Sequence, residues 1–309
     1  MYGNILRHGI YSGILKGWRG FLWMMKIIIP ISFFTVLLSS SGVLEGLDSI
    51  LGPLMGFLKL PSFAALPLIV GMLTGIYGAV AVMAVLPFSI EEMTLLAIFL
   101  LIAHNLIQEG IIQGKSGINP LTATLFRIAI AVFTVLVVSL FIEIPSVDRA
   151  GTSIAREGNL FSLKIFNDWA LAIAPLAGKI FLIIMTIMIL LETLKLLGWI
   201  PAIVSFLAPI LRIMGLSRHV GLLWVTAVVF GLAYGGAVIV EESRSGQINQ
   251  MDLKALQLSI GINHSMLEDP FLFLPLGIGA FWLWVPRLIV AVIVVRIFTA
   301  CGAVKKRLN

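Results

Sequence analysis

The same polar cluster occurs twice in this chain, once in each half, and both copies lie in strongly apolar sequence. The first copy is HNLIQE at residues 104–109, and the second, 160 residues later, is HSMLED at residues 264–269. The same spacing relates Arg127 to Arg287. A polar cluster that recurs in both halves of a hydrophobic chain is typical of a pseudo-two-fold membrane site, in which broken helices of two repeats surround a binding site near the bilayer midplane.

The composition indicates a membrane protein. Of the 309 residues, 60% are hydrophobic and 12% are charged, whereas a soluble domain carries roughly 25% charged residues. Several apolar runs extend to about 20 residues, the length needed to cross a bilayer. The net charge of +6 arises mostly from basic residues at segment ends and from the KKR tail at 305–307. This pattern favours cytoplasmic anchors over nucleic-acid binding, and it predicts a multi-pass inner-membrane protein with both termini in the cytoplasm.

The order of segments predicts an all-α fold of two equivalent repeats. Each repeat would contain three spanning helices, one interfacial helix and one glycine-broken segment; the second repeat's spans are expected at 168–197, 251–269 and 270–300. The expected divisions are an interfacial amphipathic helix at 1–17, repeat 1 at 18–145, a polar linker at 146–167, repeat 2 at 168–300 and a basic cytoplasmic tail at 301–309. A capping box at Ser89–Glu92 predicts a helix start in repeat 1.

Glycines interrupt two apolar segments, residues 61–88 and 217–240, at corresponding places in the two halves. Each segment could be a kinked span or a re-entrant hairpin, and irregular backbone at membrane depth is tolerated only where protein or a water-filled cavity satisfies it. We favour hairpins, which give three spans per repeat and inverted halves, whereas full spans would give four per repeat and parallel halves. The expected hairpin tips are Gly75, Gly78, Gly231 and Gly235.

The repeated clusters are the candidate binding site. On a continuous helix, residues four apart share a face, so His104 would point the same way as Gln108, and His264 the same way as Glu268. The candidate substrate-binding residues are His104, Asn105, Gln108, Glu109, Asn263, His264, Ser265, Glu268 and Asp269, with Tyr77 and Tyr234 at the hairpin tips and Arg127 and Arg287 on the next helices.

Three uses of such a site are consistent with its chemistry. The imidazoles and carboxylates of His104, Glu109, His264 and Glu268 suit a divalent metal such as iron, zinc or manganese. The same groups could hydrogen-bond a polar organic solute, or they could relay protons. Alternatively, they only satisfy one another and the unwound backbone. Ionisable residues inside a membrane are costly, which favours a functional role.

The two repeated arginines could have either of two roles. Arg127 could form a buried ion pair with Glu109, and Arg287 with Asp269, and each pair would lock two helices together. The alternative is an anion-binding pair. We favour the ion pairs, because the acids are close in sequence and a lone buried charge is expensive.

The order of helices and glycine-broken segments is similar to the core of concentrative nucleoside transporters. The stretches HNLIQEG at 104–110 and GINHS at 261–265 resemble the nucleoside recognition, or Gate, domain family, over about residues 18–300. That family includes the spore maturation proteins A and B and the membrane part of ferrous iron transport protein B. The resemblance implies a secondary transporter for a small polar solute or ion, nucleoside-like in its family name. It also leaves open a divalent-metal permease or a non-transporting membrane assembly factor.

An enzyme is not expected. The sequence contains no P-loop, no Gly-x-Ser-x-Gly elbow, no His-Glu-x-x-His motif and no dinucleotide fingerprint. No resident cofactor is expected either; a coupling ion would be H⁺ or Na⁺, and a divalent metal would be the transported substrate. The expected partners are the lipid bilayer, the solute or ion, and a second copy or a small membrane protein, but not a nucleic acid.

Overall fold

The computed structural model describes residues 2–43, 48–145, 162–245 and 248–308, and these residues form helices and connections without a β-strand. The α-helices of the first half are α1 Tyr2–Ser40, α3 Asp48–Phe57, α4 Ala65–Thr74, α5 Ile76–Met83, α6 Ile90–Ala103, α7 Leu106–Lys115 and α8 Pro120–Val138. Those of the second half are α9 Leu163–Leu196, α10 Ile200–Met214, α11 Arg218–Ser245, α12 Gln250–Asn263, α13 Glu268–Phe273 and α14 Ala280–Leu308. The expected all-α class is confirmed.

Five helical segments are long and apolar enough to cross a bilayer: Leu6–Ser40, Ile90–Lys115, Pro120–Val138, Leu163–Leu196 and Ala280–Cys301. The sequence had predicted six. The difference is the span expected at residues 251–269, where four residues, 264–267, separate α12 from α13, whereas only His104 and Asn105 separate α6 from α7 within Ile90–Lys115. Residues 251–269 therefore form two short helices, and the protein is a membrane protein with about five candidate spans.

The N-terminal helix, the linker and the C-terminal tail differ from the boundaries that the sequence predicted. Residues 2–40 form one helix, so the residues predicted as a separate interfacial helix at 1–17 are the first turns of α1. The side chain of Ser162 caps α9, which begins at Leu163, inside the expected linker; linker residues 146–161 lie outside the described residues. The basic tail continues α14 as a helix to Leu308.

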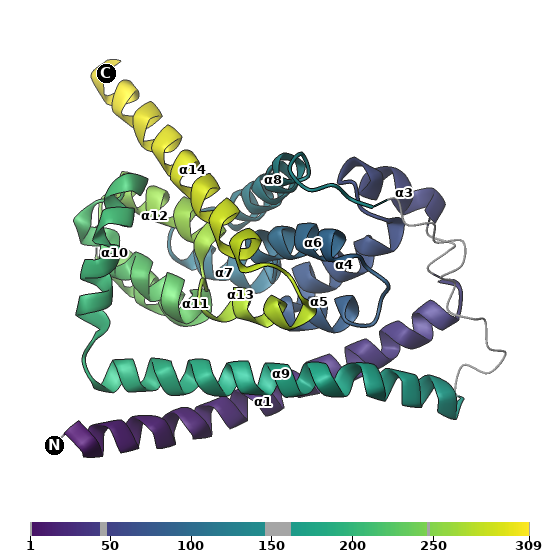
Figure 1. Cartoon of the computed structure of the whole chain (residues 1–309). Coiled ribbons are helices and arrows are strands. Elements are labelled where there is room, and N and C mark those ends of the chain that lie inside the picture. Colours follow the sequence, from purple (N-terminus) through teal and green to yellow (C-terminus); the bar gives the residue numbers. More distant parts are fainter. Residues whose placement is uncertain (1, 44–47, 146–161, 246–247, 309) are drawn as a thin grey trace.

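The two longest helices, α1 and α9, pack side by side in opposite directions along one side of the molecule (Figure 1). Glycines at every fourth position of α1 face α9; Gly9, Gly13 and Gly17 approach Thr193, Ile189 and Met185. A Cβ atom added at Gly13 would lie 2.9 Å from the backbone nitrogen of Ile189. Small residues with this spacing allow two helix backbones to come close, and the ion pair Lys16–Glu192, at 2.6 Å, adds a polar contact.

Helix α6 is the centre of the remaining bundle. Its residues from Thr94 to Ala103 are all buried, and a helix that is apolar all round belongs inside a protein. Helices α4, α8, α12 and α14 pack against it. The predicted capping box at its start is confirmed, since the Ser89 side chain accepts from the Glu92 backbone and the Glu92 side chain accepts from the Ser89 backbone.

Both glycine-broken segments fold back on themselves. The tips are Gly75 (φ 91°) and Gly231 (φ 77°), and a positive φ is a conformation that glycine adopts readily. In a straight helix, residues eight apart are about 12 Å apart. Here a Cβ added at Gly71 would lie 2.9 Å from Cβ of Ala79, and one added at Gly235 would lie 3.0 Å from Cβ of Ala227. The chain therefore reverses at each tip. Gly235, like Gly78, lies in a returning helix rather than at a tip.

The helices that carry the repeated clusters break at the two histidines. His104 ends α6 with an extended backbone (ψ 165°), and Asn105 is left-handed (φ 46°). His264 ends α12 in the same way (ψ 160°), and Ser265 is left-handed (φ 49°). The expected continuous helix from 89 to about 114 is therefore wrong. The backbone N–H of Asn105 donates to the carbonyl of Gly71 at 3.0 Å, so the folded-back segment takes a hydrogen bond that would otherwise continue the helix.

We predict that Gly13→Ala destabilises the protein by about 1–3 kcal/mol, the usual range for overpacking, because the added methyl group meets the backbone of α9. Gly178→Ala is the matched control, since Gly178 lies in α9 with nothing within 4 Å of the added Cβ. That change should be neutral or stabilise by about 0.5–1 kcal/mol. Thermal unfolding in detergent measures both, and equal losses would contradict the close α1–α9 packing.

Candidate functional site

Four side chains from the two halves converge at the centre of the protein. Nε2 of His104 lies 3.4 Å from Nε2 of His264 and 3.2 Å from Oε1 of Glu109. Oε2 of Glu109 lies 3.2 Å from Nε2 of His264, and Oδ2 of Asp269 lies 3.5 Å from Nε2 of His104. All four residues are buried. The structure thus brings together the two clusters that the sequence placed in separate halves.

The two imidazoles are held in equivalent orientations. Nδ1 of His104 donates to the carbonyl of Leu100 at 2.8 Å, and Nδ1 of His264 donates to the carbonyl of Ile260 at 2.9 Å. A carbonyl oxygen can only accept, so each Nδ1 carries a hydrogen. In the neutral ring, Nε2 then has a free lone pair, and this is how a histidine is prepared to bind a metal. Both free nitrogens face the carboxylates.

The helix breaks place the two carboxylates. Glu109 lies in the first turn of α7 and Asp269 in the first turn of α13, directly after the two breaks. A negative side chain is favourable near a helix N-terminus, where backbone N–H groups point outward. Each half thus supplies one imidazole from the end of one helix and one carboxylate from the start of the next.

Two buried arginines cap the broken helices. Arg127 donates from Nε to the carbonyl of Ile102 at 2.8 Å and from Nη2 to the carbonyl of His104 at 2.9 Å. Arg287 makes the same two hydrogen bonds to the last carbonyls of α12, at 3.1 and 2.9 Å. The last carbonyls of a helix lack partners within the helix, so each guanidinium satisfies groups that the break leaves exposed inside the protein.

The two arginines differ in their ion pairs. Nη1 of Arg127 lies 2.6 Å from Oε2 of Glu109, which confirms the first predicted pair. The second predicted pair is wrong: within the part of the chain that the structure describes, Arg287 has no carboxylate within 4.0 Å, and its Nη1 has no hydrogen-bond partner. Asp269 instead approaches His104 of the other half. Both arginine side chains are buried.

Glu268, predicted as a metal ligand, lies outside the cluster. It is partly exposed, and its Oε1 accepts a hydrogen bond from the hydroxyl of Tyr77 at 2.6 Å. Tyr77, expected at a hairpin tip beside the site, lies in α5 two residues after the tip Gly75, and it contacts Glu268 and not a histidine. The prediction was wrong because it assumed a continuous helix, in which Glu268 would share a face with His264; after the break, Asp269 takes that place.

The other predicted site residues lie around the cluster. The amide of Asn105 donates to Oε1 of Gln108 at 3.0 Å, and Gln108 is exposed, so this pair points away from the histidines. Asn263 is fully buried, and neither atom of its amide has a hydrogen-bond partner. Ser265 is buried at the second break. The side chain of Tyr234 lies outside the described residues.

A second polar group next to the site was missed from the sequence. Nε2 of Gln113 donates to Oε1 of Gln257 at 3.2 Å, and Nε2 of Gln257 donates to Oγ of Ser116 at 2.6 Å. All three side chains are buried. Gln113 could have been predicted from the sequence, because it lies four residues after Glu109 and therefore on the same face of the helix.

The cluster has the dimensions of a metal site. One ligand atom from each of His104, Glu109 and His264 lies within 4.8 Å of the other two. Two ligands bound tetrahedrally at about 2.0–2.1 Å from one ion are about 3.4 Å apart. The two Nε2 atoms are 3.4 Å apart, which agrees with this value, and each lies 3.2 Å from a different oxygen of the Glu109 carboxylate; Asp269 could supply a fourth ligand. Imidazole with carboxylate suits zinc, iron or manganese.

The chain is similar to a membrane protein of Bacillus subtilis. The chain is 27% identical over 290 residues to the uncharacterized membrane protein YvoD of Bacillus subtilis (strain 168), and the match covers 91% of each chain. No protein-family model and no solved structure matches the chain. The relative's description agrees with the membrane class that the helices indicate.

We predict that Arg127→Met destabilises the protein by about 3–5 kcal/mol, because it leaves the Glu109 carboxylate buried without its partner. The double variant with Glu109→Gln should cost less than the sum of the two single changes. The matched cycle of Arg287→Met and Asp269→Asn should show a clearly smaller coupling, since no ion pair joins these residues. Thermal unfolding in detergent measures both cycles. Equal coupling in the two would contradict the asymmetry of the arginines.

Proposed function

We propose that this protein is a secondary transporter that moves a divalent transition-metal cation across the membrane through the central histidine–carboxylate cluster. The observation that carries the proposal is the convergence of two imidazole nitrogens and two carboxylates, separated by 3.2–3.5 Å, on one buried point. The two halves of the chain share this point. Binding at the interface of two repeats, on broken helices, is the usual arrangement of alternating-access transporters.

The charges of the cluster favour a cation. The lone pairs of the two histidine Nε2 atoms and the two carboxylates are directed at one another. Arg127 neutralises the negative charge of Glu109 but does not pair with Asp269. Buried acceptors that face each other need a positive charge between them. The C-terminal ends of α6 and α12 also point at the cluster, and these ends carry partial negative charge. A bound divalent ion would satisfy all of these groups at once.

The dimensions of the cluster favour a single ion over an organic solute. Ligand atoms within 4.8 Å of one another leave room for one ion between them, whereas a nucleoside needs a cavity of hundreds of cubic ångströms. Among the members of the family that the sequence resembles, the membrane part of ferrous iron transport protein B fits this proposal best. The resemblance is a reason to include iron among the metals tested.

The proposal includes a topology. The two halves would be inverted repeats of three spans each, with the broken pair α12–α13 crossing the bilayer as α6–α7 does, and with the segments that reverse at Gly75 and Gly231 inserted as re-entrant hairpins that enter and leave on one face. One observation supports this arrangement: each tip contacts the helix break of its own half, Gly75 at Asn105 and Gly231 at Ser265. The basic residues at segment ends favour an inner-membrane protein with both termini in the cytoplasm, and they fit hairpins and full spans about equally.

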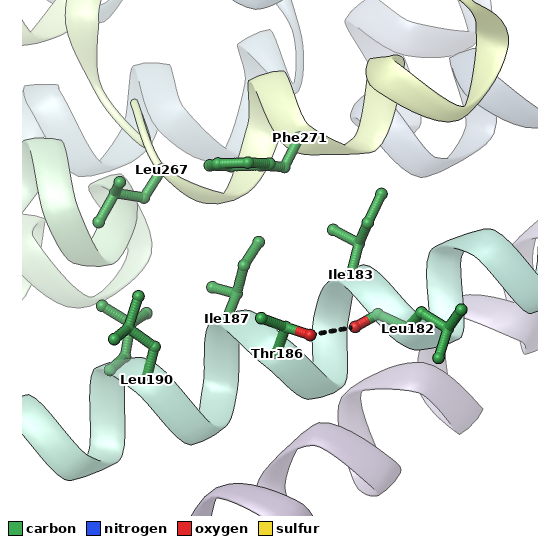
Figure 2. Close-up of a pocket in the computed structure, with 8 residues that line it drawn as sticks. Leu182, Ile183, Thr186, Ile187, Leu190, Leu267 and Phe271 are labelled. Atoms are coloured by element: carbon green, nitrogen blue, oxygen red, sulfur yellow. Dashed lines mark hydrogen bonds between the residues drawn. The ribbon is translucent and has the colours of Figure 1, made fainter.

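The packing around α13 leaves room for movement. A cavity of about 300 Å³, lined mainly by apolar side chains, separates α9 from the segment that carries Asp269. Leu267 and Phe271 face Ile183 and Ile187 across this space (Figure 2). One hydrogen bond, from Nζ of Lys179 on α9 to the carbonyl of Pro275 just after α13, at 3.4 Å, joins the two sides. Because the cavity between them is lined mainly by apolar side chains, we propose that α13 shifts relative to the α1–α9 pair, which would be the fixed part during transport.

Metal binding by the purified protein tests the proposal. We expect Zn²⁺, Mn²⁺, Co²⁺ or anaerobic Fe²⁺ to raise the unfolding temperature in detergent, whereas Mg²⁺, Ca²⁺ and nucleosides do not. A ligand present at 100 times its Kd stabilises by about 2.7 kcal/mol. His104→Ala, His264→Ala and Glu109→Gln should each lose this effect. His8→Ala is the control, since His8 is exposed and remote in sequence from the cluster.

Lowering the pH should weaken Zn²⁺ binding in the same assay. Protons compete with the metal for the two Nε2 atoms and for the carboxylates, so binding releases protons and its affinity falls on acidification. Titration calorimetry in two buffers of different ionisation enthalpy measures the released protons directly. Binding that is independent of pH would exclude the histidines as ligands.

Uptake into proteoliposomes loaded with a metal-sensitive dye tests transport itself. The wild type should accumulate the metal, and His264→Ala should not. Metal binding without uptake would favour a metal-dependent membrane factor that does not transport. Stabilisation by a nucleoside but by no metal would overturn the metal assignment and restore the nucleoside-like solute.

A further inference from the structure

A chain of buried polar side chains leads from the central cluster to one face of the protein. Gln113 lies one helical turn after Glu109 on α7, and both are buried. Ser116 follows at the end of this helix, between the exposed residues Lys115 and Gly117. Gln257, from α12 of the other half, bridges Gln113 and Ser116. We call Gln113, Ser116 and Gln257 the amide track.

The amide track lies next to the cluster. A Cβ added at Gly261 would lie 3.5 Å from Nε2 of Gln113 and 3.6 Å from Cγ of Arg127, so these two side chains are neighbours over the same residue. Arg127 in turn contacts Glu109. Oε1 of Gln113 is buried without a hydrogen-bond partner. A buried acceptor without a partner costs free energy unless water or an ion reaches it.

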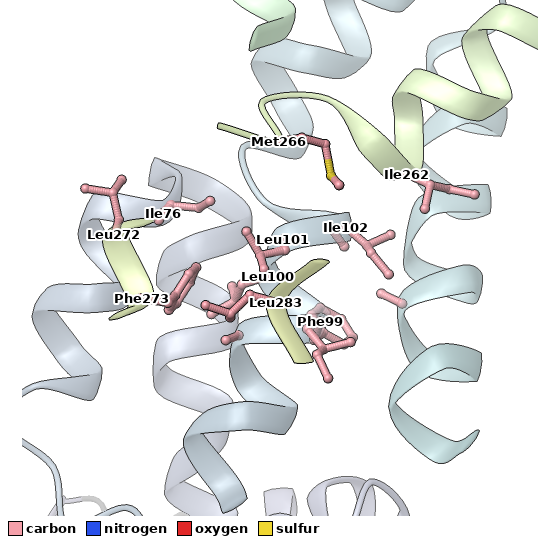
Figure 3. Close-up of a cluster of buried hydrophobic side chains, with 14 of the residues drawn as sticks. Ile76, Phe99, Leu100, Leu101, Ile102, Ile262, Met266, Leu272, Phe273 and Leu283 are labelled. Atoms are coloured by element: carbon pink, nitrogen blue, oxygen red, sulfur yellow. The ribbon is translucent and has the colours of Figure 1, made fainter. Parts of the chain in front are cut away.

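The other half has no such track. At the spacing of 160 residues that relates the two histidines, Gln113 corresponds to Phe273, Ser116 to Leu276, and Gln257 to Ala97. Phe273 and Ala97 are fully buried. Figure 3 shows Phe273 inside a dense cluster of apolar side chains together with Leu100, Leu272 and Leu283. The two halves share the cluster but differ in what lies beyond it.

Packing alone does not account for this difference. Apolar side chains fill the corresponding place in the second half, so the fold does not need amides there. Burying three polar side chains is less favourable than burying apolar ones of similar shape. Amide and hydroxyl oxygens can replace water around a passing cation, as they do in ion pathways.

We propose that Gln113, Gln257 and Ser116 line the passage through which the cation exchanges between the central cluster and the face of the protein at the α7–α8 connection. The apolar cluster around Phe273 closes the opposite side in this conformation. The proposal rests on the proposed transport function. It assigns to the three residues a role in the rate of exchange and not in the affinity of the site.

The double variant Gln113→Met/Gln257→Met in the full-length protein tests the passage. Replacing both partners of a hydrogen bond by apolar side chains of similar length is the change that best preserves stability. Stopped-flow absorbance with Co²⁺ would give association and dissociation rates. Both rates should fall by about tenfold or more with an unchanged Kd, because the passage loses the oxygen atoms that replace water. Gln250→Met, an exposed change on α12, is the control.

Unchanged rates would overturn the passage. A weaker Kd with faster dissociation would also overturn it, because the amides would then be ligands or supports of the site. Either outcome leaves the metal assignment intact, since the wild type still binds Co²⁺. A wild type that binds no metal would instead be a failure of the proposed function.

A second measurement does not depend on metal. In a Cys301→Ser background, which removes the chain's single cysteine, Gln113→Cys and Phe273→Cys place thiols at corresponding positions. A small hydrophilic methanethiosulfonate reagent should modify Gln113→Cys at least about tenfold faster, because thiol reactivity depends on access. Equal rates, or no reaction at Gln113→Cys, would overturn the passage even if metal binds.

Discussion

Two buried guanidinium groups allow two helices to stop in the middle of the protein. Without Arg127 and Arg287, the last carbonyls of α6 and α12 would be buried without donors, and each such group costs about 1–3 kcal/mol. The breaks turn His104 and His264 toward each other and begin new helices whose first turns carry the carboxylates. The central cluster therefore depends on the arginines.

The folded-back segments complete this arrangement. Each break needs an outside acceptor for its left-handed residue, and the segment that reverses at Gly75 or Gly231 supplies it through the carbonyl of Gly71 or Ala227. A tip without a side chain can approach the break closely. Movement of either segment would thus alter the geometry of the adjacent histidine, which couples the binding site to the elements that face the two sides of the molecule.

The convergence of the histidines could be predicted from the sequence because identical residues recur at one spacing. The breaks could not, since histidine followed by asparagine or serine is not by itself a helix-breaking pattern, and the assumption of a continuous helix selected Glu268 in place of Asp269. The hairpin tips Gly75 and Gly231 are 156 residues apart, whereas the two histidines are 160 residues apart, so the spacing of the histidines does not locate the tips. Matching Tyr77 with Tyr234 also placed Gly78 and Gly235 at the tips, but these two glycines belong to the returning helices.

The differences between the halves are as informative as their similarity. Equivalent backbones hold both histidines, yet Arg127 is paired with Glu109 while Asp269 approaches a histidine and has no arginine partner. Within the described residues, one carboxylate is thus paired with an arginine, and under the proposed function the other would be neutralised by the bound cation. Under the proposed function, the polar surroundings of Gln113 and the apolar surroundings of Phe273 would make the two sides of the site unequal in this conformation.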